Sequence, residues 1–511
     1  MTDDKLVIEE GSVCNPHKET CGISKVVFYV SFAIAGLFVL WGAISPGSLN
    51  TVFNAILGFT IDSFGWLYLL AVLFFLLFAA GIALSKYGDI KLGKDDDEPE
   101  YSDFAWLAML FTSGMGIGLT FWSIAEPITH YINPPFGEGG TTEAAELGMR
   151  YVFFHWGLHA WGIFTLVGLA LAYFQFRRGM PGLISSVFYP ILGDRIHGPI
   201  GNAIDVLAVL ATVFGLGTSL GLGALQINSG LSFLFNIPNT GFIQVLIIAF
   251  VALLFTGAAV TGIEKGIEFI AKWTVYFALG LMAFMFIFGP TTTIFDILVS
   301  TTGSYLNNFF AMSLWTDAIE QKGWGGSWTI FYWAWWIAWG PFVGQFVARI
   351  SKGRTVRQFV AGALIAPTVF SFVWLAAFGA TALNLEIFHG AGIADAVNAD
   401  LASAVFVTLS NYPIAMVTSI VAIILVIGFF VTSADAGTFV LGMLTSNGSM
   451  EPSGKVKGVW GATIAGVAAI LLITGGLTAL QTASIAAAFP FMFVILAMCY
   501  SLLKALKEDH G

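Results

Sequence analysis

Long apolar runs separated by short polar segments dominate the pattern of this chain. Twelve of them come near the length of about 20 residues that a membrane-spanning helix needs. They cover residues 26–44, 66–85, 104–124, 152–174, 203–227, 241–261, 266–289, 327–350, 356–382, 413–442, 458–478 and 484–504. The pattern therefore predicts an all-α membrane protein with twelve transmembrane helices.

Composition and charge agree with this prediction. The chain has 511 residues, of which 57% are hydrophobic and only 10% charged, whereas a soluble domain carries roughly a quarter charged residues. The net charge of −10 and the lack of a basic stripe argue against a nucleic-acid partner. Residues 1–25 are polar and have no apolar core, so we expect no cleavable signal peptide.

The basic residues predict the orientation of the twelve spans. If the spans alternate in direction, all but two of the 21 Lys and Arg residues fall on one side, and the exceptions are Arg150 and Lys322. Basic residues gather on the cytoplasmic side of membrane proteins, so both termini are predicted to be cytoplasmic. Cys14 and Cys21 then lie in a reducing compartment, where two spare thiols are favoured over a metal site with His17.

Two spans carry helix-breaking residues in their apolar stretch. Span 3 alternates Gly114, Gly116 and Gly118, and span 8 contains Gly340-Pro341. A broken helix is tolerated inside a membrane beside a cavity or a ligand, and paired breaks that each open five spans indicate an inverted-repeat transporter. The alternative is that the glycines of span 3 form only a helix-packing face.

Aromatic residues gather beside both of these predicted breaks. Trp335, Trp336 and Trp339 crowd onto one side of span 8, and span 4 offers a second stripe that contains Trp156, Trp161 and Phe164. An aromatic stripe usually packs in a core, but two stripes beside broken helices suggest a box of ring faces. Such a box binds a cation that cannot donate hydrogen bonds, above all a quaternary ammonium group. No acid lies in 104–125 or 327–350 to do this by charge.

Two motifs carry a resemblance that covers essentially the whole chain. GMGIGLTFWSIAEPITHY at 114–131 and WWIAWGPFVGQFVARISKGRTVRQF at 335–359 resemble the betaine/choline/carnitine transporter family. The resemblance implies a LeuT-like five-plus-five inverted repeat preceded by two helices, with the aromatic residues of spans 4 and 8 as the substrate box. Betaine carriers of the family commonly have Tyr where this chain has Phe164.

The family fold also implies a division of the chain and an assembly. We expect a cytoplasmic tail (1–25), two helices with an acidic loop (26–103), a first repeat (104–289), a periplasmic amphipathic helix and connection (290–326), a second repeat (327–504) and a short cytoplasmic tail (505–511). The surface helix within 291–316 is expected to help form a homotrimer in the bacterial plasma (inner) membrane.

Sodium is the expected coupling ion, and no organic cofactor is expected. Span 10 reads GFFVTSADAGT, and by resemblance a sodium site joins the hydroxyls of Thr432 and Ser433 to the backbone carbonyls of Phe429, Thr112 and Met115. Asp435 is a rare intramembrane acid that would support this site. The alternative is that Thr432 and Ser433 bond only to their own helix.

A second sodium near Phe342 and Thr212 is suggested by the family, although Leu216 stands where a hydroxyl is wanted. Sodium-independent exchangers of the family resemble carriers with Met at the position of Val343 and an Arg among spans 5–7. This chain has no Arg between Arg195 and Arg349, which favours sodium coupling over exchange or proton coupling.

The predicted function is import of a zwitterionic onium solute, either glycine betaine or dimethylsulfoniopropionate, by sodium symport with alternating access. Its carboxylate is expected at backbone N–H groups of Gly114, Met115, Gly116 and Gly118, at the positive end of a half-helix. Carnitine and choline are alternative substrates. From other classes, a channel or an intramembrane metal enzyme that uses His155 and His159 at i, i+4 remains open.

Overall fold

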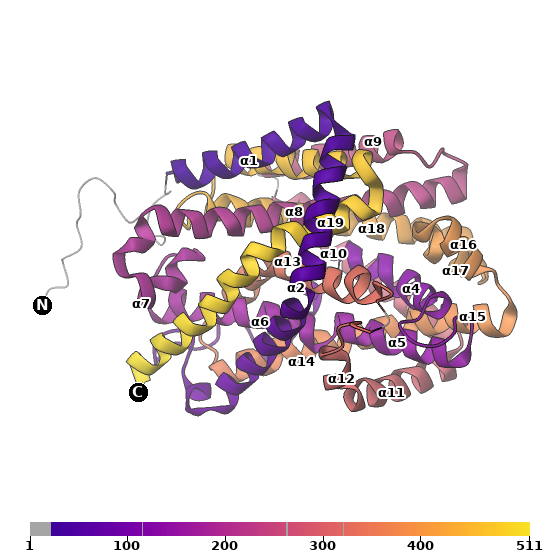
Figure 1. Ribbon diagram of the computed structural model, residues 1–511, viewed down its shortest axis with the longest axis horizontal. Helices are drawn as coiled ribbons and strands as arrows, with labels where there is room; N and C mark the ends of the chain where they lie inside the picture. Colours follow the sequence, from indigo (N-terminus) through magenta and orange to yellow (C-terminus); the bar gives the residue numbers. More distant parts are fainter. Residues whose placement is uncertain (1–21, 115, 262–263, 320, 511) are drawn as a thin grey trace, which may run out of the picture.

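The chain forms a bundle of helices (Figure 1). The computed structural model describes residues 22–114, 116–261, 264–319 and 321–510. Cys14, Cys21, His17 and Met115, together with the side chain of Thr112, lie outside the described part.

Within the described part, β-structure is limited to an isolated bridge between Lys91 and Thr355. The helices are α1 (Lys25–Ile44), α2 (Pro46–Leu84), α3 (Asp103–Gly114), α4 (Ile117–Ile132), α5 (Thr142–Trp156), α6 (Leu158–Ala172), α7 (Tyr189–Leu192), α8 (Pro199–Phe235), α9 (Gly241–Thr261), α10 (Glu264–Phe288), α11 (Thr291–Asn307), α12 (Phe309–Ser313), α13 (Phe331–Arg349), α14 (Val356–Leu375), α15 (Thr381–His389), α16 (Ile393–Ala399), α17 (Ala404–Ser410), α18 (Ala415–Leu444) and α19 (Gly454–His510).

Long apolar helices confirm the class of fold. Among the described residues, 8 helices are long and apolar enough to cross a membrane by length and composition. They are Lys25–Ile44, Pro46–Leu84, Thr142–Arg177, Pro199–Phe235, Glu268–Phe288, Val356–His389, Ala415–Leu444 and Gly454–Asp509. The last one contains non-helical backbone at Gly475 and Gly476, so α19 consists of two helices that meet at this point. Gly476 has a φ of +58°, a conformation that glycine adopts without steric cost.

Helix α13 lies at the centre of the bundle, where it packs against α6, α8 and α19. In Figure 1, α1, α8 and α18 run along the longest axis of the molecule, and α2 lies across them. The beginning of α1 and the end of α19 lie at the same end of the bundle. The α11 and α12 helices form the predicted surface segment, and α11 exposes large apolar side chains at Phe295, Val299 and Leu306.

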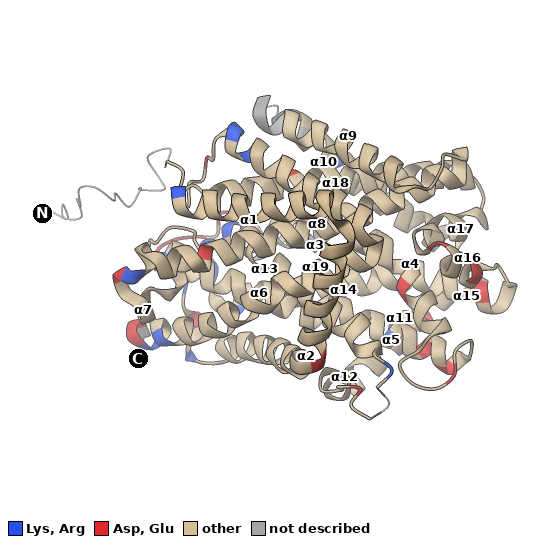
Figure 2. Ribbon diagram, turned by 45° about the horizontal axis from the view of Figure 1, so that its top comes forward, with Lys and Arg blue, Asp and Glu red and all other residues tan. Residues whose placement is uncertain are grey.

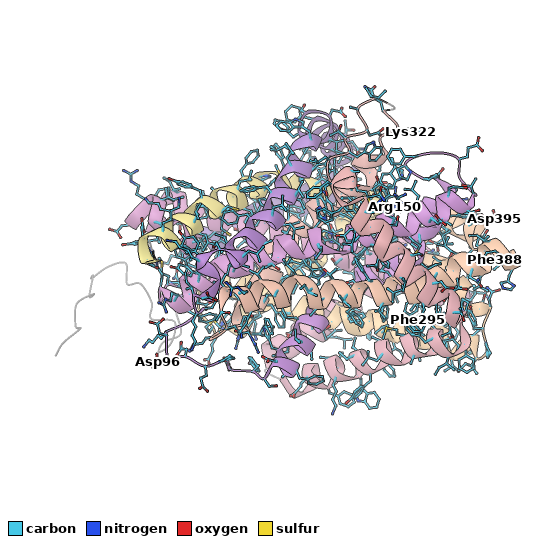
Figure 3. The ribbon with its side chains drawn as sticks, turned by 90° about the horizontal axis from the view of Figure 1, so that it is seen from below. Asp96, Arg150, Phe295, Lys322, Phe388 and Asp395 are labelled. Atoms are coloured by element: carbon cyan, nitrogen blue, oxygen red, sulfur yellow. The ribbon has the colours of Figure 1, made fainter. Side chains whose placement is uncertain are left out.

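Charged side chains gather at the two ends of the bundle and are sparse between them (Figure 2). Most Lys and Arg residues lie at the end where α1 begins and α19 finishes. Figure 3 shows Asp96 in that half of the molecule and Arg150 and Lys322 in the other half. A middle poor in charge is what a lipid environment requires, because burying charge in hydrocarbon is costly.

The break predicted in span 3 is confirmed. Helix α3 ends at Gly114 and α4 begins at Ile117, with Gly116 in an extended conformation at φ −163° and ψ −178°. The break predicted at Gly340-Pro341 is wrong, because α13 runs through both residues. Proline removes only one backbone donor, and a buried, tightly packed helix tolerates that loss.

A second break lies in span 4 instead. Gly157 separates α5 from α6 with φ −94° and ψ −141°. A Cβ atom at Gly157 would lie 2.5 Å from the backbone oxygen of Phe153, so a larger residue does not fit this bend. Further along, a Cβ atom at Gly168 of α6 would lie 3.1 Å from the backbone oxygen of Gly344 of α13. Gly168 and Gly344 therefore allow α6 and α13 to approach each other closely.

Candidate functional site

The two predicted aromatic stripes meet in the structure. Trp156 is the last residue of α5 and lies just before the bend at Gly157. The ring centroid of Trp336, on α13, lies 4.9 Å from that of Trp156 and 6.1 Å from that of Phe164. Trp335 stacks on Trp336 with centroids 4.8 Å apart. We use the name ring cluster for Trp156, Trp161, Phe164, Trp335, Trp336 and Trp339.

The members of the ring cluster contact one another directly. Trp156 and Trp336 meet edge to face at an angle of 71°, and Trp161 lies 5.5 Å from Phe164. A cation binds over the face of such a ring, within about 6 Å of its centroid.

Hydrogen bonds fix the orientation of three indole rings. The Nε1–H group of Trp156 donates to Oε2 of Glu126 at 2.9 Å. The Nε1–H group of Trp336 donates to the His155 carbonyl at 2.9 Å. The Nε1–H group of Trp339 donates to the Gly215 carbonyl at 3.0 Å. A buried indole N–H needs such a partner. The buried Nε1–H of Trp335 has no hydrogen-bond partner within the described structure.

Glu126 is a site residue that sequence reasoning missed. It lies one position beyond the stretch 104–125 that was read as acid-free, and its side chain is fully buried on α4. The expectation that no carboxylate adjoins the aromatic box is therefore wrong. The signal was present, because an acid within an apolar span is usually functional, and Glu126 belongs to the motif at 114–131.

Gly118 lies directly against the ring cluster. A Cβ atom at this position would lie 2.5 Å from Cη2 of Trp335 and 3.1 Å from Cη2 of Trp156. Gly118 belongs to the first turn of α4, whose N-cap is Gly116, and the first N–H groups of a helix lack intrahelical partners and carry a partial positive charge. The structure thus places the first N–H groups of α4, with their partial positive charge, next to the rings of Trp335 and Trp156.

Four of the residues expected around sodium line a common cavity. Its volume is about 260 Å³, and its walls include Phe342, Phe429, Thr432 and Ser433 together with Trp339 of the ring cluster. Trp339 thus belongs both to the wall of this cavity and to the ring cluster. The other walls are mainly apolar, and the hydroxyl-bearing residues that line the cavity are Thr274 of α10 and Thr432 and Ser433 of α18.

The hydroxyl of Thr432 bonds to its own helix. Its Oγ1–H lies 2.9 Å from the Gly428 carbonyl and 3.3 Å from the Phe429 carbonyl, as the alternative reading of this residue expected. Since a hydroxyl that donates its proton keeps two lone pairs, Oγ1 can still ligate a cation. The observed bond is compatible with both readings.

Other expected supporting residues lie outside this cavity. Asp435 is not among the residues that line it, although it belongs to the same helix α18. Thr212 donates to the Ala208 carbonyl at 2.8 Å. The side chain of Leu216 is fully buried and contacts the backbone at Gly437. The structure gives no feature that favours a second ion at Thr212.

The structure does not bring His155 and His159 to a common ligand position. His155 contacts Glu126 at 2.7 Å and Thr329 at 3.0 Å, whereas His159 contacts Ser313 at 2.8 Å. The bend at Gly157 interrupts the i, i+4 spacing on which the metal-enzyme alternative depended.

A different group has the geometry for a metal ion. Potential ligand atoms of Glu126, His130 and His155 all lie within 4.8 Å of one another. Each of these residues is fully buried, and each is already engaged in the hydrogen-bond network around the Glu126 carboxylate.

Comparison with known proteins identifies the family. The model of the betaine/carnitine/choline family transporters (BCCT) matches residues 26–511. The chain is 53% identical over 487 residues to a "Probable glycine betaine transporter" of Desulfitobacterium hafniense (strain Y51), covering 95% of this chain and 98% of that protein. It is 49% identical to the "Glycine betaine transporter OpuD" of Bacillus subtilis (strain 168), covering 95% and 94%. It is 41% identical to a "High-affinity choline transport protein" of Escherichia coli (strain K12), covering 96% and 74%.

These relatives are transporters and not enzymes, and their similarity extends over nearly the whole chain. The long apolar helices, the ring cluster and the match together lead to one conclusion: the chain belongs to the betaine/carnitine/choline family of membrane transporters.

Proposed function

We propose that this protein imports glycine betaine, or the related onium zwitterion dimethylsulfoniopropionate, by sodium symport. The observation that carries the proposal is the position of Gly118 against Trp335 and Trp156. Ring faces bind the methylated onium head, and the first N–H groups of α4 bind the carboxylate. A molecule that carries both groups at a short distance engages both parts of the site.

Sodium coupling is supported by the cavity between α13 and α18. Phe429, Thr432 and Ser433 border the same cavity as Trp339 of the ring cluster. An ion bound there would contact the substrate site through Trp339, so that sodium and substrate favour the same conformation. Because a zwitterion feels no net membrane potential, the driving force is that of the ion, about 2.3 kcal/mol per 100 mV for each sodium.

For the arrangement in the membrane we propose twelve spans in a LeuT-like five-plus-five repeat, with both termini in the cytoplasm of a bacterium. The two halves of α19 and the broken α3–α4 pair support this count, and the cluster of Lys and Arg at one end supports the orientation. The exposed apolar side chains of α11 support a homotrimer whose subunits meet at this helix.

The test is uptake by purified protein in proteoliposomes. Glycine betaine, dimethylsulfoniopropionate, carnitine and choline are compared with an inward sodium gradient, with an equal potassium gradient, and with the membrane potential collapsed. We expect saturable uptake of the two zwitterions that requires sodium and rises with the potential. Uptake that proceeds equally well in potassium would refute sodium coupling, and failure to accumulate any onium solute would refute the function.

A further inference from the structure

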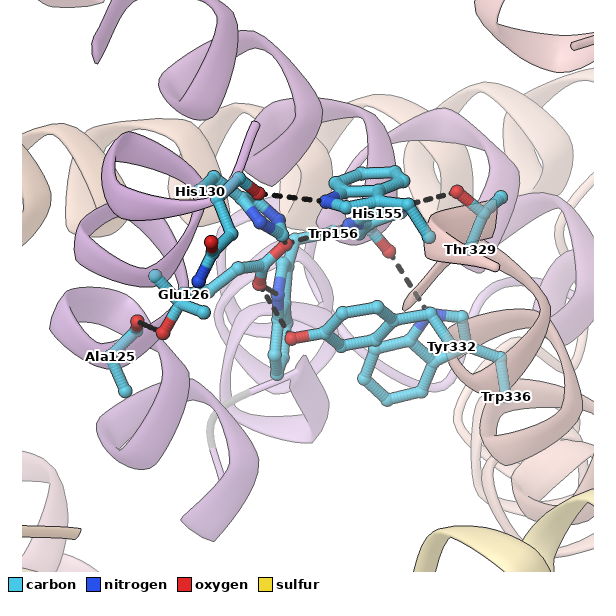
Figure 4. Close-up of polar contacts among 11 residues, drawn as sticks. Ala125, Glu126, His130, His155, Trp156, Thr329, Tyr332 and Trp336 are labelled. Carbon is cyan, nitrogen blue, oxygen red and sulfur yellow. Dashed lines mark hydrogen bonds and ion pairs between the residues drawn. The ribbon is translucent and has the colours of Figure 1, made fainter. Parts of the chain in front are cut away.

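Glu126 joins three helices through one fully buried carboxylate (Figure 4). Oε1 lies 2.7 Å from Nδ1 of His155 on α5 and 3.2 Å from Nε2 of His130 on α4. Oε2 accepts hydrogen bonds from Nε1 of Trp156 at 2.9 Å and from the hydroxyl of Tyr332 on α13 at 2.5 Å. No Lys or Arg contacts Glu126 among the described residues.

The partners of the carboxylate fit an anion. An ionised carboxylate offers about four lone-pair positions and no donor. Nε1 of Trp156 and the hydroxyl of Tyr332 donate to it, and Nδ1 of His155 and Nε2 of His130 donate in the tautomers that carry hydrogen on those atoms. His155 is compatible with this role, since its Nδ1 faces Glu126 while its Nε2 faces the hydroxyl of Thr329 at 3.0 Å. With neutral histidines in these tautomers every contact of the carboxylate is a donor and the negative charge stays on Glu126, while the buried Nδ1 of His130 has no hydrogen-bond partner within the described structure.

Three partners of Glu126 belong to the ring cluster or contact it: Trp156, Tyr332 and His155. Trp156 is a member of the ring cluster, and Tyr332 stacks on Trp336 with centroids 5.8 Å apart and an angle of 28°. His155 bonds Glu126 through its ring, and its backbone carbonyl accepts the N–H of Trp336. The orientation of Trp156 and Trp336, which meet edge to face, therefore depends on one carboxylate.

The charge has a second consequence. An indole N–H that donates to a carboxylate is polarised, as hydrogen-bonded groups polarise one another in a low dielectric, so the face of Trp156 becomes more negative. The carboxylate lies at the edge of that ring, 2.9 Å from Nε1, and both residues are buried, so water screens its charge little. Both effects favour an onium cation over a neutral solute of the same shape.

Resting on the proposed function, we infer that Glu126 is a positioning and specificity-determining residue of the onium site. It anchors Trp156 and Tyr332 in place, and it supplies the negative charge that attracts the onium head. Held rings and a fixed counter-charge preorganise the site, which reduces the cost of ordering it around a ligand.

Two substitutions separate these contributions. Glu126→Gln removes the charge but keeps the side-chain length and one oxygen that still accepts from Trp156 and Tyr332, while its amide faces His155, which can change tautomer. Glu126→Asp keeps the charge but shortens the side chain by one methylene and so breaks the anchoring. The matched control is Asp205→Asn, which alters another buried carboxylate, bonded to Ser185 and outside the site.

The measurement is binding of choline and of glycine betaine to purified protein in sodium, followed by tryptophan fluorescence. Choline carries a net positive charge, so in Glu126→Gln we expect its Kd to rise about tenfold, whereas the Kd of the zwitterion rises about threefold or less. In Glu126→Asp we expect both Kd values to rise by a similar factor. Asp205→Asn should leave the ratio of the choline Kd to the betaine Kd unchanged.

Several results would overturn the inference. If the ratio of the choline Kd to the betaine Kd is the same in Glu126→Gln as in the wild type, the charge effect is excluded. If both Kd values in Glu126→Asp equal those of the wild type, the anchoring role is excluded. A stoichiometric transition metal in the wild type that is lost in Glu126→Gln would make the cluster a metal site. If Glu126→Gln does not fold, the test uses Tyr332→Phe, which removes one donor to the carboxylate but keeps the ring. This variant must raise the Kd of both solutes about threefold. By contrast, a wild type that binds no onium solute refutes the proposed function itself.

Discussion

Gly118 lies so close to Trp335 that a single added carbon would overlap the ring: a Cβ atom there would lie 2.5 Å from Cη2 of Trp335. This contact joins the first turn of α4 to the centre of α13. It places the broken third span and the aromatic stripe of the eighth at the same point, although more than 200 residues separate them in the sequence.

We expect Gly118→Ala to weaken glycine betaine binding by about tenfold, because the methyl group must displace Trp335 or Trp156 from its place in the ring cluster. Gly81→Ala on α2 is the matched control, since a Cβ atom at Gly81 meets no atom within 4 Å and this residue lies outside the expected substrate site. The measurement is Kd by tryptophan fluorescence. Equal affinities in the two variants would contradict the close contact.

Gly118→Asp tests where the substrate carboxylate binds. The added side chain perturbs the ring cluster for every substrate, but its charge acts in opposite directions, since it attracts the onium head of choline and repels the carboxylate of glycine betaine. We expect the ratio of choline to betaine uptake to increase relative to Gly118→Ala. A constant or lower ratio would show that the carboxylate does not bind beside Gly118.

Trp336→Leu keeps an apolar side chain but removes the ring face and the hydrogen bond to the His155 carbonyl. We expect glycine betaine affinity to fall by one to two orders of magnitude, or about 1.4–2.8 kcal/mol, as measured by the concentration dependence of uptake in proteoliposomes. Trp273→Leu on α10, where the indole is 44% exposed, is the control and should behave as the wild type. Unchanged affinity in Trp336→Leu would refute a ring-based site.

The double substitution Thr432→Ala and Ser433→Ala removes two hydroxyls from the cavity beside Trp339. We expect half-maximal uptake to need at least tenfold more sodium, with a smaller effect on substrate affinity at saturating sodium. Thr418→Ala is the control, because this buried hydroxyl bonds the Ala415 carbonyl near the start of the same helix. An unaltered sodium dependence would mean that these hydroxyls bond only to their own helix.

Arg354 anchors the beginning of α3 at the end of the bundle that carries most basic residues. Its guanidinium lies 3.9 Å from the ring centroid of Trp106 and 2.7 Å from Asp103, and it is almost completely buried. Arg354→Lys keeps the charge but loses the planar stacking on Trp106 and the forked donors. We expect a loss of about 1–2 kcal/mol in stability, mainly from the stacking, because Asp103 is 86% exposed.

The measurement for Arg354→Lys is the thermal unfolding midpoint in detergent. Arg357→Lys serves as the control, because that side chain is 51% exposed where it pairs with Asp89 and exposed ion pairs contribute little. Equal midpoints in the two variants would contradict the anchoring role of Arg354.

The sequence by itself determined the class of the protein and the residues that make up the ring cluster. Apolar runs of about 20 residues lead to membrane helices because lipid offers no partner for backbone groups, and this holds whatever the tertiary packing. The side on which Trp335, Trp336 and Trp339 lie follows from helical periodicity alone. The break between Gly114 and Ile117 was likewise visible, since glycine-rich stretches interrupt helices in recognisable ways.

Only the tertiary structure decided which interruptions are real and which polar groups meet. Gly340-Pro341 breaks helices in general, yet α13 continues through it because its neighbours pack around it, whereas Gly157 bends span 4 where a Cβ atom would meet the Phe153 carbonyl. Glu126 is one acid in a motif until the fold brings donors from α4, α5 and α13 around its carboxylate. Such contacts depend on distances between segments far apart in the chain, so the sequence of a single helix does not predict them.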